Sequence, residues 1–105
     1  MKAEKFNEVV SRRLKIVSSL LKTKGAEYST DVDRLHNFKR ASEILGVTPA
    51  KACISFLAKH LVSIMDMVEY GKTPSQAMID EKFTDAINYF LLLEAVLMEQ
   101  EAETK

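Results

Sequence analysis

The stretch EKFTDAINYFLLLEAVLM, residues 81–98, decides the fold of this chain because it is the most apolar segment of the sequence. After Lys82 its only formally charged residues are Asp85 and Glu94, and its second half is apolar nearly all round. A helix that is hydrophobic on every side is buried on every side, whereas a small bundle buries one stripe of each helix. The segment therefore predicts a helix over residues 80–100 that contacts a second subunit as well as its own chain.

Three further segments have apolar residues at every third or fourth position, the spacing typical of helices. They are residues 4–22, 33–46 and 49–70. The apolar stripes of these segments are Phe6, Val10, Leu14, Val17 and Leu21; then Leu35, Phe38, Ala41 and Leu45; then Ile54, Leu57, Leu61, Ile64 and Val68. We expect each stripe to face the core.

Residues that start and stop helices fall between these segments. Thr48 followed by Pro49 predicts an N-cap and a first turn, since threonine caps helices and proline suits their first position. Gly25, Gly46 and Gly71 are expected to end the three helices that precede them. Thr30 or Asp31 is available to cap the second helix, and Thr73 with Pro74 predicts a single further turn.

No segment alternates between apolar and polar residues over a useful length, so no strand is expected. The 105 residues suffice for one domain, 1–105, and are too few for two. These observations predict an all-α fold, a four-helix bundle that oligomerises through its C-terminal helix.

Composition narrows the classes of function. Fifteen basic and fifteen acidic residues cancel, so no overall field favours nucleic acid or an anionic membrane. No stretch has the length of a membrane span and no signal peptide is recognisable, which predicts a cytoplasmic protein. Cys53 is the only cysteine and lies in the apolar run ACISFLA. It is expected to be a small core residue.

The last helix carries polar residues that do not fit a purely structural role. Glu81, Asp85 and Asn88 follow at i, i+4 and i+7 and therefore share one side. Buried carboxylates are costly unless they are paired or bound to something. One interpretation pairs Asp85 with an arginine or lysine of a neighbouring helix. The other places Asp85 and Asn88 in a small-molecule site, where Glu81 and Asp85 could also hold Mg²⁺.

The third helix has a matching anomaly, because Lys59, Ser63 and Asp66 follow at i, i+4 and i+7 with His60 beside them. Lys59 and His60 are candidates for contact with phosphate or a base, and Ser63 adds a hydroxyl group. For the two histidines, His36 and His60, simple packing is the alternative interpretation. No arrangement for nucleophilic catalysis is recognisable, so no catalytic residue is predicted.

The second helix and the connection before it add further candidates. Asn37 and Arg40 lie at i and i+3 in HNFKRA. An asparagine can bind a base edge and an arginine can bind a phosphate with two parallel hydrogen bonds. Lys39 points elsewhere and is expected to be solvated. Tyr28 could stack on a base.

A family pattern follows from these elements in order: Lys-x-x-x-Tyr, HNFKRA, GVTPAKA, AKHLVSIMDMV and EKFTDAINY, covering roughly residues 24–89. It resembles small phage and prophage helical proteins of the nucleotide modification associated type and their phage relatives. Their fold is similar to the all-α NTP pyrophosphohydrolases of the MazG and dimeric dUTPase group, which implies a nucleotide ligand. The corresponding residues here are Tyr28, Asn37 with Phe38, Lys59, and Asp85 with Asn88 and Tyr89.

The chain departs from that pattern where catalysis is concerned. MazG-type enzymes bind Mg²⁺ through a Glu-Glu-x-x-Glu helix and a later Glu-x-x-Asp. This chain has no Glu-Glu-x-x-Glu, its later element is Glu81-x-x-x-Asp85, and Ser29 stands where the family has glycine. Two-metal hydrolysis of a phosphoanhydride therefore lacks half its ligands.

Three functions remain as hypotheses. The first is an oligomeric protein that binds a nucleotide or cyclic signalling nucleotide, sequestering it without a required cofactor. Its binding residues are Tyr28, Asn37, Arg40, Lys59, His60, Ser63, Asn88 and Tyr89. The second is a Mg²⁺-dependent nucleoside triphosphate pyrophosphohydrolase with Glu81, Asp85 and Asp66 as metal ligands, completed by carboxylates of a neighbouring subunit such as Glu43 or Glu69. The third is a protein-interaction module that inhibits a host protein.

Overall fold

The computed structural model describes residues 1–28, 33–71 and 73–104, with the side chains of residues 24–28, 103 and 104 outside the description. Within these ranges every regular secondary-structure element is a helix, which confirms the all-α prediction. None of the described helices is both long enough and apolar enough to cross a membrane. The four helices are α1 (Ala3–Tyr28), α2 (His36–Leu45), α3 (Pro49–Glu69) and α4 (Gln76–Thr104).

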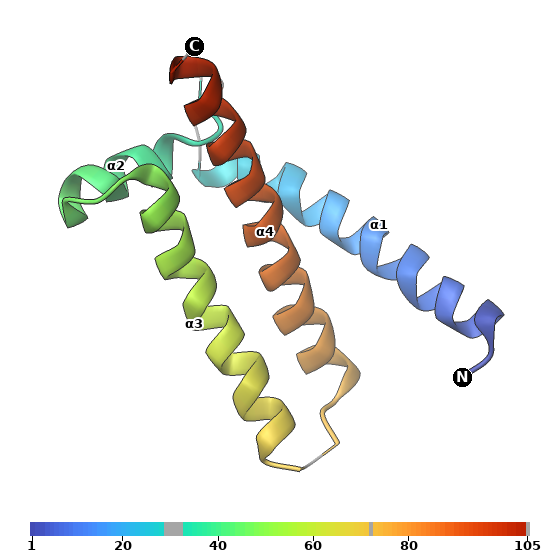
Figure 1. Ribbon diagram of the computed structural model, residues 1–105. Helices are drawn as coiled ribbons and strands as arrows, with labels where there is room; N and C mark the ends of the chain where they lie inside the picture. Colours follow the sequence, from blue (N-terminus) through green and yellow to red (C-terminus); the bar gives the residue numbers. More distant parts are fainter. Residues whose placement is uncertain (29–32, 72, 105) are drawn as a thin grey trace.

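The helices form an open arrangement built on one antiparallel pair. α3 and α4 pack along each other, α2 packs against α3, and α1 packs mainly against α4. The N-terminal end of α1 leads away from the other helices (Figure 1). The Cα radius of gyration is 15.9 Å, whereas a compact domain of this length has about 13 Å. The chain therefore leaves apolar surface uncovered that a closed bundle would bury.

Three of the predicted helix signals act as the sequence indicates. The hydroxyl oxygen of Thr48 accepts a hydrogen bond from the backbone N–H of Lys51, and Pro49 occupies the first position of α3. Gly46 ends α2 in the left-handed conformation, with φ of 69°. Gly71 also has a positive φ, 65°, directly after the C-cap of α3 at Tyr70.

Replacing Thr48 with alanine should lower the free energy of unfolding by about 1 kcal/mol, because a donor at the start of α3 loses its partner. Chemical denaturation followed by circular dichroism measures this directly. Thr48→Ser, which keeps the hydroxyl group, serves as the control and should retain most of the stability. Equal losses in both variants would contradict the capping role.

Other predicted boundaries are wrong by a few residues. α1 continues through Gly25 to Tyr28, since one glycine inside a helix costs only about 1 kcal/mol and does not by itself end it. The single turn predicted after Thr73 is the beginning of α4, which starts at Gln76 and ends at Thr104. Its cap is Ser75, whose hydroxyl oxygen accepts from the N–H of Met78. The caps proposed at Thr30 and Asp31 lie outside the described residues.

The core lies where α2, α3 and α4 meet. Its buried members are Leu35, Phe38, Cys53 and Val96, with Tyr89 packed against them. Cys53 is fully buried, as predicted. Burial raises the pKa of its thiol to about 11, so the thiol stays protonated and unreactive at neutral pH.

The apolar stripe predicted for α3 is only partly buried. Leu57 lies in the core, whereas Ile54, Leu61 and Val68 are exposed. The reason is that α3 is apolar on two sides and only one of them meets α4 and α2. α4 has the same property, because Phe90 and several neighbouring side chains remain exposed on the side that its own chain leaves uncovered.

Candidate functional site

A cleft of about 520 Å³ lies among all four helices and the turn before α2. Its volume is within the range of about 300–1,000 Å³ that is usual for small-molecule sites. Five residues singled out in the sequence line it together: Asn37, His60, Asp85, Asn88 and Tyr89. The structure thus brings one polar residue of α2, one of α3 and three of α4 to a single concave surface. The other lining residues are Leu21, Arg34, Phe38, Phe56 and Leu92.

Aromatic rings form one wall of the cleft. The imidazole of His60 stacks on Tyr89 with 4.9 Å between ring centroids and 26° between planes. Phe56 lies 6.3 Å from Tyr89 and 6.1 Å from Phe38, both in tilted contact. Burial, followed by the nearby Asp85 carboxylate, raises the pKa of the Tyr89 phenol, so the ring is neutral at physiological pH. The wall therefore presents aromatic ring faces on which another ring can stack.

The charged groups of the cleft are few. His60 Nδ1 lies 3.9 Å from Asp85 Oδ2, an ion pair when the imidazole is protonated. This contact replaces the arginine or lysine that the structural interpretation of Asp85 required. Arg34 is the one lysine or arginine among the lining residues that the structure describes. No described carboxylate pairs with it.

Asn88 is the most unusual residue of the cleft. Its side chain is buried, with only 6% of the residue exposed, and its amide oxygen Oδ1 has no hydrogen-bond partner among the described residues. A buried acceptor without a partner costs about 1–3 kcal/mol. Asn88 also lines the cleft, so a ligand there could supply the missing donor.

Three other described candidates, Arg40, Lys59 and Ser63, lie away from the lining. Arg40 is exposed and bonded to Glu43, with 2.8 Å between Nη1 and Oε2. Lys59 is exposed, so it does not share the cleft with Asp85. The hydroxyl oxygen of Ser63 accepts a hydrogen bond from Lys82. The side chain of Tyr28 lies outside the described residues.

The three candidate metal ligands do not assemble within one chain. Glu81 and Asp66 are exposed, and Asp85 faces His60. In the described parts of the chain, no three residues of histidine, cysteine, aspartate and glutamate come close enough to hold a metal ion. Metal binding by these residues would need carboxylates from elsewhere.

Two features of the site were not foreseen. Arg34 enters the cleft from the turn before α2; its position three residues before Asn37 is the signal that could have placed it there. Lys39, expected to be solvated, bonds to Asp33 and Glu99 at 2.7 and 2.5 Å and so joins the start of α2 to α4. These bonds raise the pKa of the Lys39 amine.

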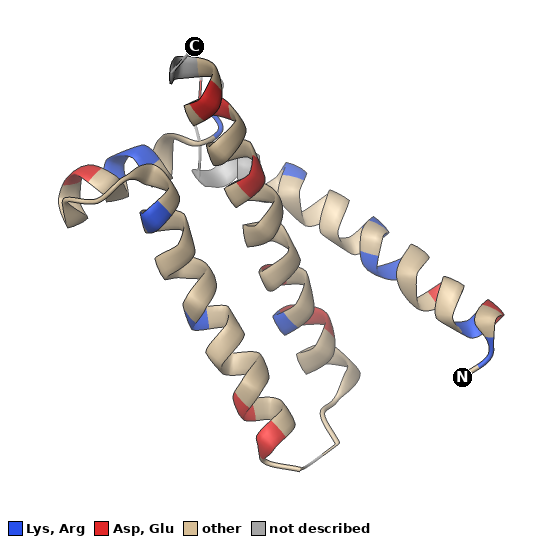
Figure 2. Ribbon diagram, viewed as in Figure 1, with Lys and Arg blue, Asp and Glu red and all other residues tan. Residues whose placement is uncertain are grey.

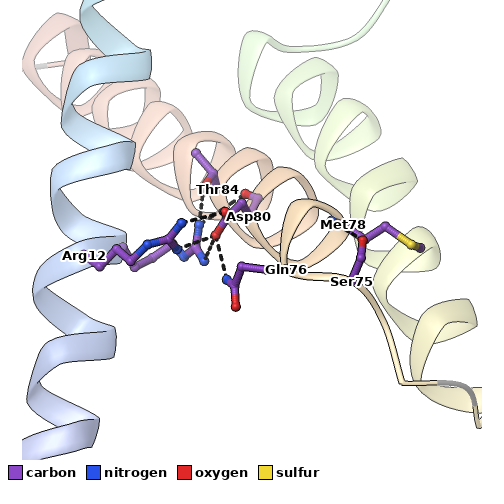
Figure 3. A network of polar contacts seen from close by, with 7 residues as sticks. Arg12, Ser75, Gln76, Met78, Asp80 and Thr84 are labelled. Carbon is purple, nitrogen blue, oxygen red and sulfur yellow. Dashed lines mark hydrogen bonds and ion pairs between the residues drawn. The ribbon is translucent and has the colours of Figure 1, made fainter.

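A second polar network holds α1 against α4 (Figure 3). Both guanidinium nitrogens of Arg12 donate to the carboxylate of Asp80, at 2.6 and 2.8 Å. Arg13 donates to the same carboxylate at 2.6 Å and to the hydroxyl oxygen of buried Thr84 at 2.8 Å. Since α1 contributes Leu21 to the cleft, this network fixes one wall of the site.

Comparison with known proteins gives no family for this chain. No protein-family model matches it, and neither the curated proteins nor the solved structures contain a significant match. The function must therefore be argued from the cleft itself.

Proposed function

We propose that the chain binds a nucleotide of low charge in the cleft and holds it without breaking a bond. The observation that carries this proposal is the buried amide oxygen of Asn88, which lines the cleft without a hydrogen-bond partner among the described residues. Unpaired buried acceptors are rare in folded proteins because they cost stability. A ligand that donates an N–H to Asn88 offsets this cost.

The aromatic wall suits a nucleobase. A base that stacks on the paired rings of His60 and Tyr89 would gain about 1–3 kcal/mol, the magnitude seen for base–aromatic contacts. Its edge would then face Asn88, whose oxygen accepts from an exocyclic amine or a ring N–H. Asn37 lines the cleft from α2 and offers a second amide for the base or sugar.

The charge of the cleft indicates how many phosphates the ligand carries. Arg34 offers one guanidinium that has no ion-pair partner among the described residues, and Asp85 adds a negative charge beside His60. A triphosphate carries about four negative charges and would require further cations. One phosphate, as in a nucleoside monophosphate or a cyclic mononucleotide, matches a single arginine.

The resemblance to phage proteins of the nucleotide modification associated type supports the same ligand class. Five of the residues that carry it line the cleft: Asn37, Phe38, Asp85, Asn88 and Tyr89. We further propose a MazG-like relationship for the fold and a role in sequestering the nucleotide. The missing Glu-Glu-x-x-Glu element and the separated carboxylates favour binding over hydrolysis.

Equilibrium dialysis against nucleoside monophosphates, cyclic mononucleotides and triphosphates, with EDTA or with Mg²⁺, tests the proposal. One monophosphate or cyclic nucleotide should bind in EDTA and be recovered intact after denaturation of the protein. Ribose 5-phosphate, which lacks a base, should stay free. If no nucleotide is retained at millimolar concentration, the proposal fails; new products in Mg²⁺ would favour the pyrophosphohydrolase.

Arg34→Gln sharpens the same test. We expect about a tenfold or greater loss of affinity for the monophosphate, with binding of the matching nucleoside little changed, because only the phosphate contact is removed. Arg40→Gln is the matched control, since Arg40 is exposed and bonded to Glu43. Equal effects of the two substitutions would place the phosphate elsewhere.

A further inference from the structure

The outer side of the α3–α4 pair carries an exposed apolar surface. On α3 it consists of Ile54, Ala58, Leu61, Met65 and Val68, spaced four, three, four and three residues apart. This is the heptad spacing by which one helix packs along another. Met65 and Val68 are 58% and 70% exposed, so no other described helix covers this row of five side chains, which we call the α3 seam.

α4 extends the surface with Phe83, Phe90 and Leu97, which recur every seven residues and are all exposed. Successive residues of a helix are rotated by 100° about its axis, and α3 and α4 run antiparallel. With this rotation, the three α4 side chains and the α3 seam lie on the same side of the helix pair. α1 packs on the other side of α4, through Asp80 and Thr84. We call this exposed surface, made of the eight side chains named for α3 and α4, the α3–α4 face.

Charges at the two ends of the α3 seam indicate what covers it. α3 is basic in its first half and acidic at its end (Figure 2). Lys51 and Glu69 are both exposed, and neither has an ion-pair partner among the described residues. They are 18 residues apart, which is five full turns and about 27 Å, so both point to the same side of the helix. The opposite charges of two copies of this helix lie next to each other only when the two copies run antiparallel.

We propose that two copies of this chain form a symmetric dimer through the α3–α4 face, with their α3 helices antiparallel. Lys51 of each copy then meets Glu69 of the other, and the apolar seams cover each other between these pairs. Four helices, α3 and α4 from each copy, close around a shared core. The sequence predicts self-association through the last helix alone; the exposed seam of α3 adds the second half of the interface. Because α1 lines the cleft and packs on the side of α4 away from the α3–α4 face, both binding sites remain accessible in the dimer.

Sedimentation velocity of the wild-type protein, at concentrations from about 1 to 100 µM, tests the dimer. We expect twice the chain mass of 11.9 kDa. Met65→Glu should give a monomer with an unchanged helical circular dichroism spectrum, because the side chain is exposed. Ile44→Glu is the matched control: Ile44 is 81% exposed on α2, off the face, and this variant should remain dimeric. A monomeric wild type, or a Met65→Glu variant that still dimerises, would overturn the proposal.

The antiparallel pairing has its own test. Lys51→Glu should raise the dimer dissociation constant about tenfold, since two like-charged contacts replace two attractive ones. The double variant Lys51→Glu/Glu69→Lys should restore it. Failure of the second substitution to restore the dimer would overturn the antiparallel arrangement. The monomeric Met65→Glu variant should keep its nucleotide affinity, so failure of the dimer and failure of nucleotide binding are distinguishable.

Discussion

Replacing Asn88 with leucine is expected to stabilise the protein and to abolish its affinity for the ligand. The amide oxygen of Asn88 is buried and unpaired among the described residues, and leucine has a similar branched shape without a polar group. Removing the unpaired acceptor should raise the free energy of unfolding by about 1–3 kcal/mol. The same substitution removes the group that we expect to bind the base. Stability and binding should therefore change in opposite directions, as is common for functional residues.

Thermal denaturation and equilibrium dialysis on the same preparation measure both effects. Thr84→Val is the matched control, because Thr84 is also a buried polar residue of α4 but accepts a hydrogen bond from Arg13. It should lose about 1–3 kcal/mol, since a charged donor is left without its acceptor. If Asn88→Leu is destabilised to a similar degree, Asn88 serves the fold and the cleft loses its main support as a binding site.

Acidification should weaken the attachment of α1 to α4. Hydrogen bonds from Arg12, Arg13 and Gln76 hold the pKa of the Asp80 carboxyl well below its ordinary value. A carboxyl whose pKa is lowered by folding contributes stability that is fully present above about pH 4, the pKa of the unfolded chain, and is lost as the pH falls further. We therefore expect the melting temperature to fall between about pH 4 and pH 2.

The variant Asp80→Asn isolates this contribution. At pH 7 its melting temperature should be several degrees below that of the wild type, because the ion pairs with both arginines are lost. Between pH 4 and pH 2 it should lose less stability than the wild type. Asp66→Asn, at an exposed carboxylate, should follow the wild-type profile. Parallel pH profiles for wild type and Asp80→Asn would show that Asp80 does not fasten α1.

The helices could be predicted because their signals are local. Thr48 with Pro49 and Gly46 act within one turn of chain, and the structure has the expected cap and left-handed residue at these positions. The end of α1 could not be placed from Gly25, because the cost of a helical glycine is small compared with tertiary packing. Periodicity also could not tell which side of α3 is covered, since Leu57 and Leu61 both belong to apolar stripes.

Residues of the candidate site could be predicted where a polar residue occurs in an otherwise apolar stretch of sequence. Asn88 stands out in an apolar helix, and the structure places it in the cleft. Arg34 carries no such contrast, because an arginine near the start of a helix is ordinary. Its spacing of three residues from Asn37 is a weak local signal, and its position depends on how α2 docks. The Asp80 network likewise joins residues 67 and 68 positions apart in sequence, a pairing that no local pattern encodes.

The attachment of α1 has a consequence for the order in which the molecule opens. The main hydrophobic cluster is built from α2, α3 and α4, whereas the described side chains of α1 contribute one buried apolar residue, Val17, and the two arginines that pair with the partly exposed carboxylate of Asp80. Segments with few buried contacts undergo local unfolding before the rest of a protein. We therefore expect the amide hydrogens of α1 to exchange first with solvent, independently of global unfolding. Since α1 contributes Leu21 to the cleft, local opening of α1 would also open the proposed binding site while the core stays folded.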